Sequence, residues 1–364
     1  MIKYIVHITL LFLLSFVPII SGAKALSPIL WNIAKLQSLT PDSADYKEIV
    51  RKADSFLGKP SIVVTNKVSS LSSDIHNYES LSTYFWEDES NPEGPYIYKD
   101  GEKNPERLDY DGAKINDFSY RTKYLAQAYF LTGDNRYSAQ WLADVHAWFI
   151  DKSTFMNPNF EYAQVVKNTQ DNHGNYYGII DAYVLIDVVE SVLLMKELKA
   201  CNKKTYRKIK YWFEDFSTWM RESGNGIKQS QASNNLSVAY DVMMCEFYYY
   251  IGDKKRYEQI VGQFLSDRLE KQFLPDGTQP HELKRAKPIS YSIYNLELVL
   301  DFCTMQWHSG VDYYSQNRQL IDAAMDYVAN AVLQVDNLNN AEKPDLPVLK
   351  KKYNALLTGF ANIR

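Results

Sequence analysis

Apolar residues recur at helical spacing through most of the chain. Positions i, i+3 and i+4 are apolar over eight long segments, whereas alternating, strand-like runs are few and short. The eight segments are 118–131, 138–150, 179–198, 205–221, 237–250, 258–272, 294–306 and 319–335. The pattern therefore predicts a mostly α-helical protein.

Two stretches of sequence resemble each other, one around Gly133-Asp134 and one around Gly252-Asp253. Glycine is favoured just after the end of a helix, and aspartate is favoured as the cap of the next one. Each stretch therefore predicts a helix hairpin. Repeated hairpins stack into bundles, solenoids or closed rings, and periodicity alone leaves all three open.

The helical pattern is interrupted by two irregular stretches, residues 74–117 and residues 156–178. The first is rich in turn-forming residues and in aromatic rings, and loops of this length in a compact domain are commonly functional. No linker rich in Pro, Gly or Ser divides the chain after its first residues. We therefore expect one domain over residues 24–364, with long irregular loops.

The first residues have the pattern of a signal peptide. Lys3 provides positive charge, residues 4–20 are almost wholly apolar, and small residues follow at 21–25. The apolar run is near the lower limit for crossing a bilayer, which favours cleavage over a retained anchor. A signal peptide over residues 1–23 predicts a secreted or periplasmic protein with no membrane contact after cleavage.

Composition and net charge restrict the classes of molecule that the chain is expected to bind. Its 364 residues carry a formal net charge of −4, so no basic field indicates nucleic acid as a partner. Aromatic residues make up 14%, and such rings can stack on sugars, although most are expected at helix contacts. The three cysteines and six histidines show no metal-ligand spacing, so we expect no cofactor and no metal.

An arginine and a tyrosine precede the apolar segment at 294–306. Arg285 follows a turn at residues 275–280, and Tyr291 comes six residues after the arginine. A guanidinium can neutralise the carboxylate of a sugar acid, and a phenol can carry a proton to or from the same sugar. This pairing is what β-elimination of a uronic-acid polymer requires.

Four blocks of sequence extend this interpretation. They are Tyr84-Phe85-Trp86 with residues 95–106, residues 156–164 with 178–181, Ser233-Asn234-Asn235, and residues 276–280 continuing through Asn295-Leu296. In this order they resemble the alginate lyase superfamily, nearest to polysaccharide lyase families 5 and 38. The resemblance implies an incomplete (α/α) toroid of helix hairpins with long irregular loops over a groove. It also implies an anionic polysaccharide or oligosaccharide as substrate, cleaved by elimination.

The resemblance assigns catalytic roles to matching positions. Tyr291 matches the tyrosine that acts as acid and, in a syn elimination, also as base. Arg285 and Asn235 match the residues that neutralise the substrate carboxylate. A tyrosine base needs a nearby cation to lower its pKa, and Arg285 is the expected source.

One position departs from the family pattern. Leu236 stands where the resemblance expects a histidine after the asparagine pair, and leucine cannot exchange a proton. Two other histidines are candidates to replace it. We include His173 among the catalytic residues and His281 among those that bind substrate.

The other candidates are expected to bind substrate or to support the residues that do. Tyr84 and Trp86 are candidates for stacking on sugar rings, although Trp86 fits a plug beneath its loop equally well. Gln279 and Glu282 are candidates for orienting Arg285. The full substrate-binding set is Asn234, Tyr84, Trp86, Gln279, His281, Glu282 and Lys287.

Two alternative functions remain open. A catalytically impaired pseudo-lyase would bind a glycan without cleaving it, and Leu236 is the observation that favours it. An α/α-barrel hydrolase of uronate oligosaccharides would need two carboxylates at catalytic separation. Asp181, Asp241 and Glu282 are available, but no motif pairs them. The sequence leaves the polymer and the oligomeric state open, with a monomer as the expectation.

Overall fold

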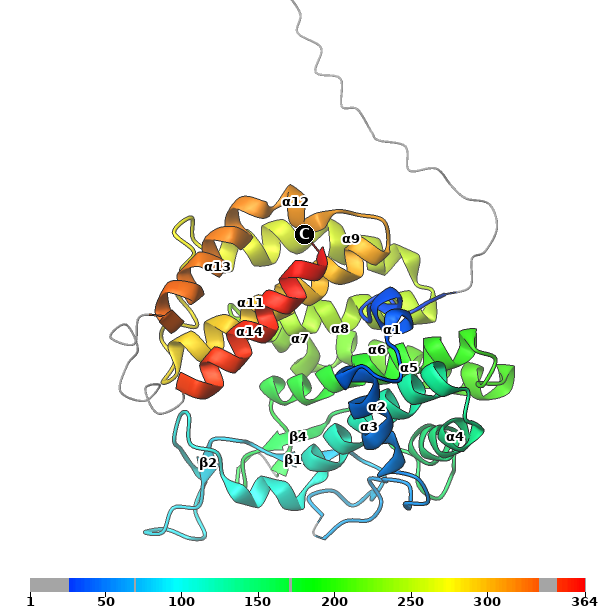
Figure 1. The fold of residues 1–364 in the computed structure, drawn as a ribbon. Coiled ribbons are helices and arrows are strands. Elements are labelled where there is room, and N and C mark those ends of the chain that lie inside the picture. Colours follow the sequence, from blue (N-terminus) through cyan, green and yellow to red (C-terminus); the bar gives the residue numbers. More distant parts are fainter. Residues whose placement is uncertain (1–25, 69, 170–171, 334–345, 364) are drawn as a thin grey trace, which may run out of the picture.

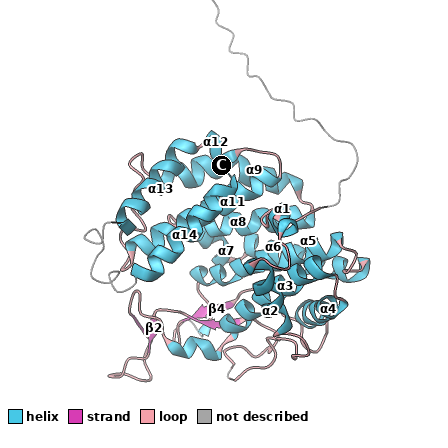
Figure 2. Ribbon diagram, viewed as in Figure 1, coloured by secondary structure: helices cyan, strands magenta, loops and turns pink. Residues whose placement is uncertain are grey.

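The computed structural model describes residues 26–68, 70–169, 172–333 and 346–363. The signal peptide expected at residues 1–23 lies outside these residues. Within them, helices dominate and the strands form only two small sheets (Figure 1, Figure 2). The mostly α prediction is confirmed. Among the described helices, none is both long enough and apolar enough to cross a membrane.

The elements of the first half of the chain are α1 (Ile33–Ser38), α2 (Ala44–Asp54), β1 (Glu79–Leu81), β2 (Phe85–Trp86), β3 (Ile97–Tyr98), the 3₁₀ helix η1 (Pro105–Asp109), α3 (Asp111–Thr132), α4 (Asn135–Phe149), β4 (Tyr162–Val165) and the 3₁₀ helix η3 (Tyr176–Val184). Those of the second half are α5 (Leu185–Glu197), α6 (Lys203–Glu222), α7 (Gly224–Ser230), α8 (Asn235–Ile251), α9 (Lys254–Phe264), the π-helical turn η4 (Leu265–Leu269), α10 (Glu270–Gln272), α11 (Pro288–His308), α12 (Tyr313–Gln316), α13 (Arg318–Leu333) and α14 (Leu346–Ile363).

Neighbouring helices stack around α8. Helix α3 packs against α4 and α5, α8 packs against α6, α9 and α11, and α11 packs against α13 and α14. Figure 1 shows α9 and α11–α14 in one half of the molecule and α2–α6 in the other, with α7 and α8 between them. Both predicted hairpin turns are confirmed, because Gly133 and Gly252 end α3 and α8 with φ values of 69° and 78°.

Helix ends differ from the predicted segments for identifiable reasons. Helix α3 begins at Asp111 and α11 at Pro288, earlier than the apolar pattern indicates, and each starts with a residue that favours a first turn. Proline suits that first turn, where its missing N–H has no partner to lose. The predicted helices at 179–198 and 258–272 are each interrupted, the first by η3 and the second by η4.

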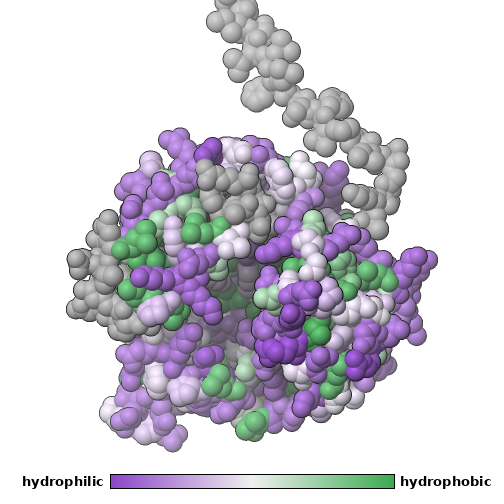
Figure 3. Space-filling view, in the orientation of Figure 1, coloured by the Kyte–Doolittle hydropathy of each residue, from purple (hydrophilic) through white to green (hydrophobic). Residues whose placement is uncertain are grey.

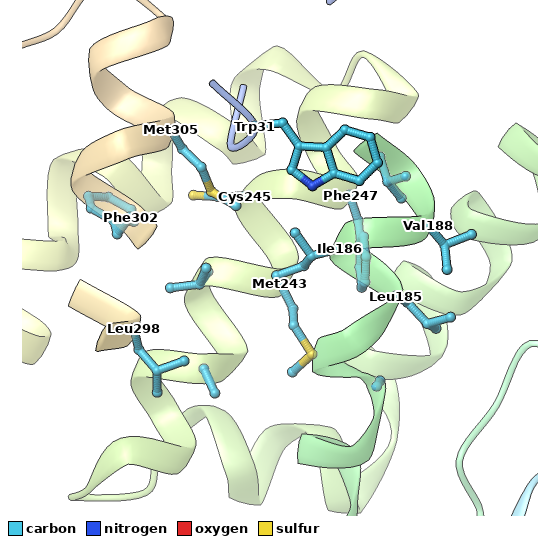
Figure 4. Packing of buried hydrophobic residues seen from close by; sticks show 14 of the residues in the cluster. Trp31, Leu185, Ile186, Val188, Met243, Cys245, Phe247, Leu298, Phe302 and Met305 are labelled. Atoms are coloured by element: carbon cyan, nitrogen blue, oxygen red, sulfur yellow. The ribbon is translucent and has the colours of Figure 1, made fainter. Parts of the chain in front are cut away.

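One hydrophobic core joins the two halves. Almost every residue of α8 is buried, as expected for a helix that is apolar on all sides. Met243 and Phe247 of α8 lie among side chains of α5 and α11, including Leu185 and Leu298 (Figure 4). The core therefore fixes α8 relative to helices from both halves.

A short parallel pairing fastens the two irregular stretches to each other. Strand β1 pairs with β4, with Glu79 opposite Tyr162 and Leu81 opposite Val165. These segments come from the two stretches that interrupt the helical pattern. The pairing places the chain around residue 82 beside the chain around residue 164.

A buried pair of acids ties the start of the described chain to the core. Glu190 of α5 accepts hydrogen bonds from the backbone amides of Ile29, Leu30 and Trp31 at 2.8, 2.9 and 2.5 Å. Burial raises the pKa of Glu190 to about 7, and burial together with Glu190 raises the pKa of Glu246 well above its ordinary value. Burial and the nearby charge of Glu190 therefore favour the protonated form of Glu246.

We predict that Glu246→Gln makes stability less dependent on pH. The folded-state pKa of Glu246 is raised, so its contribution is fully present below its ordinary pKa and is lost as the pH rises through the folded-state value. The wild-type Tm should fall as the pH rises above 4.5, the ordinary pKa of this carboxyl group, towards its folded-state value. The Tm of the variant should fall less, because its neutral amide does not titrate. Glu258→Gln on the exposed face of α9 serves as control. Equal slopes for wild type and Glu246→Gln in calorimetry contradict the prediction.

Candidate active site

A pocket of about 910 Å³ opens between the irregular stretches and the helices α8 and α11. Its walls come from segments far apart in the sequence. The lining residues are Ser82, Thr83, Tyr84, Phe85, Tyr98, Lys103, Arg107, Asn116, Gln164, Tyr176, Tyr177, Ile180, Asp181, Tyr183, Val184, Asn234, Asn235, Leu236, Arg285, Tyr291 and Tyr294. The space-filling view shows a recess near the centre of this face, bordered by hydrophilic and hydrophobic residues (Figure 3).

Tyr291 lies between an arginine and a second tyrosine. The Nη2 atom of Arg285 donates a hydrogen bond to the Tyr291 hydroxyl at 2.8 Å. The Tyr291 hydroxyl donates in turn to the Tyr84 hydroxyl at 2.7 Å. The guanidinium carbon also lies 3.9 Å from the centre of the Tyr291 ring. The two phenols therefore form a hydrogen-bonded pair at the pocket wall.

The pKa of Tyr291 is raised, whereas the neighbouring Arg285 was expected to lower it. Burial raises this pKa and Tyr84 raises it further, and together they outweigh the lowering by Arg285. The predicted proximity of a cation, Arg285, to the Tyr291 phenol is correct. The sequence could not show that desolvation raises the pKa of the phenol more than this cation lowers it. The phenol therefore holds its proton at neutral pH, which suits a general acid.

Asp100 fixes the position of Arg285. Its Oδ1 lies 3.0 Å from Nη2 of Arg285, and its Oδ2 accepts the backbone amide of Ala286 at 2.9 Å. Burial raises the pKa of Asp100, but Arg285 and the amide lower it more, so the group is a carboxylate. The ion pair offsets the charge of Arg285 and holds its guanidinium against Tyr291. Sequence reasoning missed this role, although Asp100 lies in one of the four blocks.

Asn235 is held in the pocket wall by Glu282. Its backbone amide donates to Oε1 of Glu282 at 2.7 Å, and its side-chain Nδ2 lies 2.9 Å from both carboxylate oxygens. Contact with both oxygens is the geometry of one N–H directed between them, which leaves the second N–H of the amide for another acceptor. Asn235 lines the pocket, and Asn234 beside it caps α8.

The loop that carries Glu282 and Arg285 is fastened on two sides. Gln279 donates to the carbonyl of Ser292 at 2.9 Å and accepts from Asn295 at 3.0 Å, which joins the loop to α11. Gly277 has φ of 81°, and a Cβ there would lie 2.0 Å from the carbonyl oxygen of Ala323 in α13. The loop therefore rests directly on the backbone of α13, and only glycine fits at the contact.

The model of a known protein family matches most of the chain. The sequence model described as alginate lyase matches residues 63–338.

The chain belongs to the alginate lyase family.

An alginate lyase from Bacteroides ovatus has a similar structure, with 29% identity, a TM-score of 0.85 and coverage of 92% of this chain and 91% of that one. Alginate lyase A1-III from Sphingomonas species A1 matches at 16% identity and a TM-score of 0.52, over 88% of this chain and 77% of that one. A variant of A1-III complexed with a tetrasaccharide matches at 16% identity and a TM-score of 0.53, over 85% and 77%. No curated protein matches the sequence.

These matches confirm the predicted incomplete (α/α) toroid. Membership of the alginate lyase family and the shared fold support a polysaccharide lyase. Five of the predicted catalytic and substrate-binding residues line the pocket of this family member, namely Tyr291, Arg285, Asn235, Asn234 and Tyr84. Leu236 lines it as well, at the position where the resemblance expected histidine.

The two candidate histidines lie outside that pocket. His173 is exposed, stacks on Tyr162 and lies 3.4 Å from a carboxylate oxygen of Glu161. The Nδ1 atom of His281 lies 3.3 Å from the hydroxyl of Ser233, in a separate hollow beside Arg268. Neither ring is therefore positioned to replace the missing histidine at the pocket wall.

The remaining candidates also lie away from the pocket surface. The indole of Trp86 donates to the carbonyl of Glu102 at 3.0 Å and is half-buried under its own loop. Gln279 and Glu282 are buried behind the pocket wall. Glu282 was expected to orient Arg285, but its hydrogen bonds are with Asn235. Lys287 stands at the cap of α11.

Sequence reasoning missed a strained residue in the pocket. Gln164 has φ of 48°, a conformation that costs a non-glycine residue about 1–3 kcal/mol and that clusters at functional sites. Its Nε2 donates to Asp181 at 2.8 Å, and its backbone amide donates to Ser80 at 2.8 Å. Only the tertiary structure shows this strain, although Gln164 belongs to the second block of the resemblance.

We predict that Glu282→Ala destabilises the protein. The substitution leaves the buried backbone amide and side chain of Asn235 without their acceptor, which should lower the free energy of unfolding by about 2–4 kcal/mol. Urea denaturation measures the change, with Glu222→Ala on the exposed end of α6 as control. If Glu282→Ala unfolds at the same urea concentration as the control, Glu282 does not hold Asn235.

Proposed function

We propose that this protein cleaves a uronic-acid-containing polysaccharide, such as alginate, polymannuronate or glucuronan, by β-elimination. The observation that carries the proposal is the Arg285–Tyr291–Tyr84 series of hydrogen bonds at the wall of a pocket that Asn235 also lines. A relative with 29% identity is an alginate lyase, and a more distant one binds a tetrasaccharide. Both support a polymeric sugar acid as substrate.

The reaction begins with neutralisation of the substrate carboxylate. The C5 proton of a uronate is poorly acidic until the charge of its carboxylate is balanced by hydrogen bonds. The second amide N–H of Asn235 supplies one such bond, and Glu282 holds that amide in place. Arg285 adds positive charge nearby, although its main contacts are Asp100 and Tyr291.

The tyrosines then carry the protons. In a syn elimination, ionised Tyr291 takes the proton from C5, the C4–O bond breaks, and a C4=C5 double bond forms. The same phenol returns the proton to the departing glycosidic oxygen. Leu236 offers no proton, and both candidate histidines lie outside the pocket, which supports Tyr291, with Tyr84 beside it, as the proton carrier.

We predict that activity rises steeply with pH. Because the pKa of Tyr291 is raised, only a small fraction of the phenol is ionised at neutral pH. That fraction, and with it kcat/KM, should rise about tenfold for each pH unit below the pKa. Initial rates of unsaturated-uronate formation, followed by ultraviolet absorbance, measure the profile. A rate that does not change across the alkaline range shows that Tyr291 is not the base.

We predict that Tyr291→Phe lowers kcat by about 100- to 10,000-fold, because the variant loses the proton carrier and keeps the ring. Tyr84→Phe should have a smaller effect, since Tyr291 remains. Tyr211→Phe, on the exposed face of α6, is the control. Full product absorbance from Tyr291→Phe excludes the mechanism.

A catalytically impaired pseudo-lyase is the second candidate, and the observation that favours it is Leu236 at the pocket wall. Mannuronate-rich, guluronate-rich and glucuronate polymers separate the two candidates. Calorimetric binding without any unsaturated product supports the pseudo-lyase.

The structure gives no support to a hydrolase, which would need two carboxylates in the pocket. Asp241 is paired with Arg268 at 2.8 Å, and Glu282 is bonded to Asn235. Asp181 is therefore the one acid among the described lining residues.

The proposal includes export of the protein. The apolar segment and small residues at 1–23 support cleavage by signal peptidase and a secreted or periplasmic location. Residues 24–364 would then form the single mature domain.

A further inference from the structure

A second arginine lines the pocket, and it differs from Arg285 in its contacts. Arg107, in η1, is half-buried, and its Nε atom is buried without a hydrogen-bond partner. Among the described residues, no acid forms an ion pair with it. A buried guanidinium nitrogen without a partner costs about 1–3 kcal/mol, so such a group calls for an explanation.

Arg285 is less available than Arg107 to an anion from outside the chain. Its guanidinium contacts Asp100 through two nitrogens, at 3.0 and 3.4 Å, and donates to Tyr291. Asp100 offsets the charge, and these contacts occupy the donors on one edge of the guanidinium. A sugar carboxylate would have to compete with a carboxylate that the protein already holds in place.

The surroundings of Arg107 are positively charged, although the chain has a net charge of −4. Lys103 also lines the pocket, and its pKa is lowered first by burial and then by Arg107, Lys352 and Lys287. Lys103 is thus repelled by three other cations on this side of the protein. Such a cluster is unfavourable in the free protein and is relieved when an anion binds.

The acid among the lining residues does not balance these cations. Asp181 is fully engaged, since it accepts hydrogen bonds from Tyr78 at 3.0 Å, Ser80 at 2.6 Å and Gln164 at 2.8 Å. Burial raises its pKa and outweighs the lowering by these donors and by Arg107, so its negative charge is disfavoured and offsets Arg107 only in part. The pocket thus presents Arg107 and Lys103 to an anion that must come from outside the chain.

We propose that Arg107 binds the carboxylate of a uronate unit in the pocket, with Lys103 adding to the positive charge, while Arg285 positions Tyr291. This inference rests on the proposed function, because it names the group that recognises the acidic sugar. A guanidinium matches a carboxylate with two parallel hydrogen bonds, which gives geometric selectivity as well as attraction. Arg107 is therefore a determinant of specificity for acidic over neutral sugars.

Calorimetric titration with two probes tests the proposal. One probe is a mannuronate trimer, and the other is the same trimer with its carboxylates converted to methyl esters. Arg107→Gln should weaken binding of the acidic trimer about 10- to 100-fold and leave binding of the ester unchanged. Arg107→Lys should recover part of the affinity through its charge alone. Arg136→Gln, exposed at the start of α4, is the matched control and should bind both trimers like the wild type.

Three results overturn the proposal. They are an unchanged affinity of Arg107→Gln for the acidic trimer, an equal loss for both trimers, and a wild type that does not distinguish the trimers. Thermal denaturation without ligand supplies a second readout. Because Arg107 has a buried nitrogen without a partner, Arg107→Gln should not lower the Tm, whereas a merely structural arginine would lower it.

The outcomes also separate this inference from the proposed function. If the wild type forms no unsaturated product and Arg107→Gln still loses affinity for the acidic trimer, elimination is wrong and the carboxylate site stands. If the wild type forms product and Arg107→Gln binds the acidic trimer normally, the lyase stands and the site is wrong.

Discussion

The contact between Glu282 and the start of α8 holds the candidate site together. Glu282 belongs to the same loop as Arg285, and Asn235 begins the helix that the core surrounds on all sides. Because Glu282 is buried away from water, breaking its hydrogen bonds to Asn235 would cost much free energy, so the loop is fixed relative to α8. Gln279 fixes the same loop to α11, which carries Tyr291. These contacts fix the positions of the Asn235 amide, the Arg285 guanidinium and the Tyr291 phenol relative to one another.

The parts of the site that could be predicted from the sequence are those whose residues lie close together within short motifs. Tyr291, Arg285 and Asn235 lie in short motifs next to helix starts, so the resemblance could single them out, and all three line the pocket. Asp100 and Arg107 could not be identified in this way, because a charged residue in a turn-rich segment has the pattern of a solvated surface. Only long-range packing places them at the pocket.

The same limit applies to the fold and to electrostatics. Apolar spacing predicted the long helices, but their first residues are set by caps and by Pro288, which the spacing does not include. Proximity of Arg285 to Tyr291 was predictable, whereas the degree of burial was not. Since desolvation has the larger effect on the phenol, knowing that Arg285 is near Tyr291 did not suffice to predict the direction of its pKa shift.

The contact of Gly277 with α13 links the outer helical layer to the chemistry. The backbone of the loop touches the carbonyl of Ala323 with no side chain between them. A shift of α13 is therefore transmitted to the loop without a compressible layer to absorb it. In this architecture α13 acts as a rigid support beneath the loop that carries Arg285, so its position influences where that guanidinium meets the Tyr291 phenol.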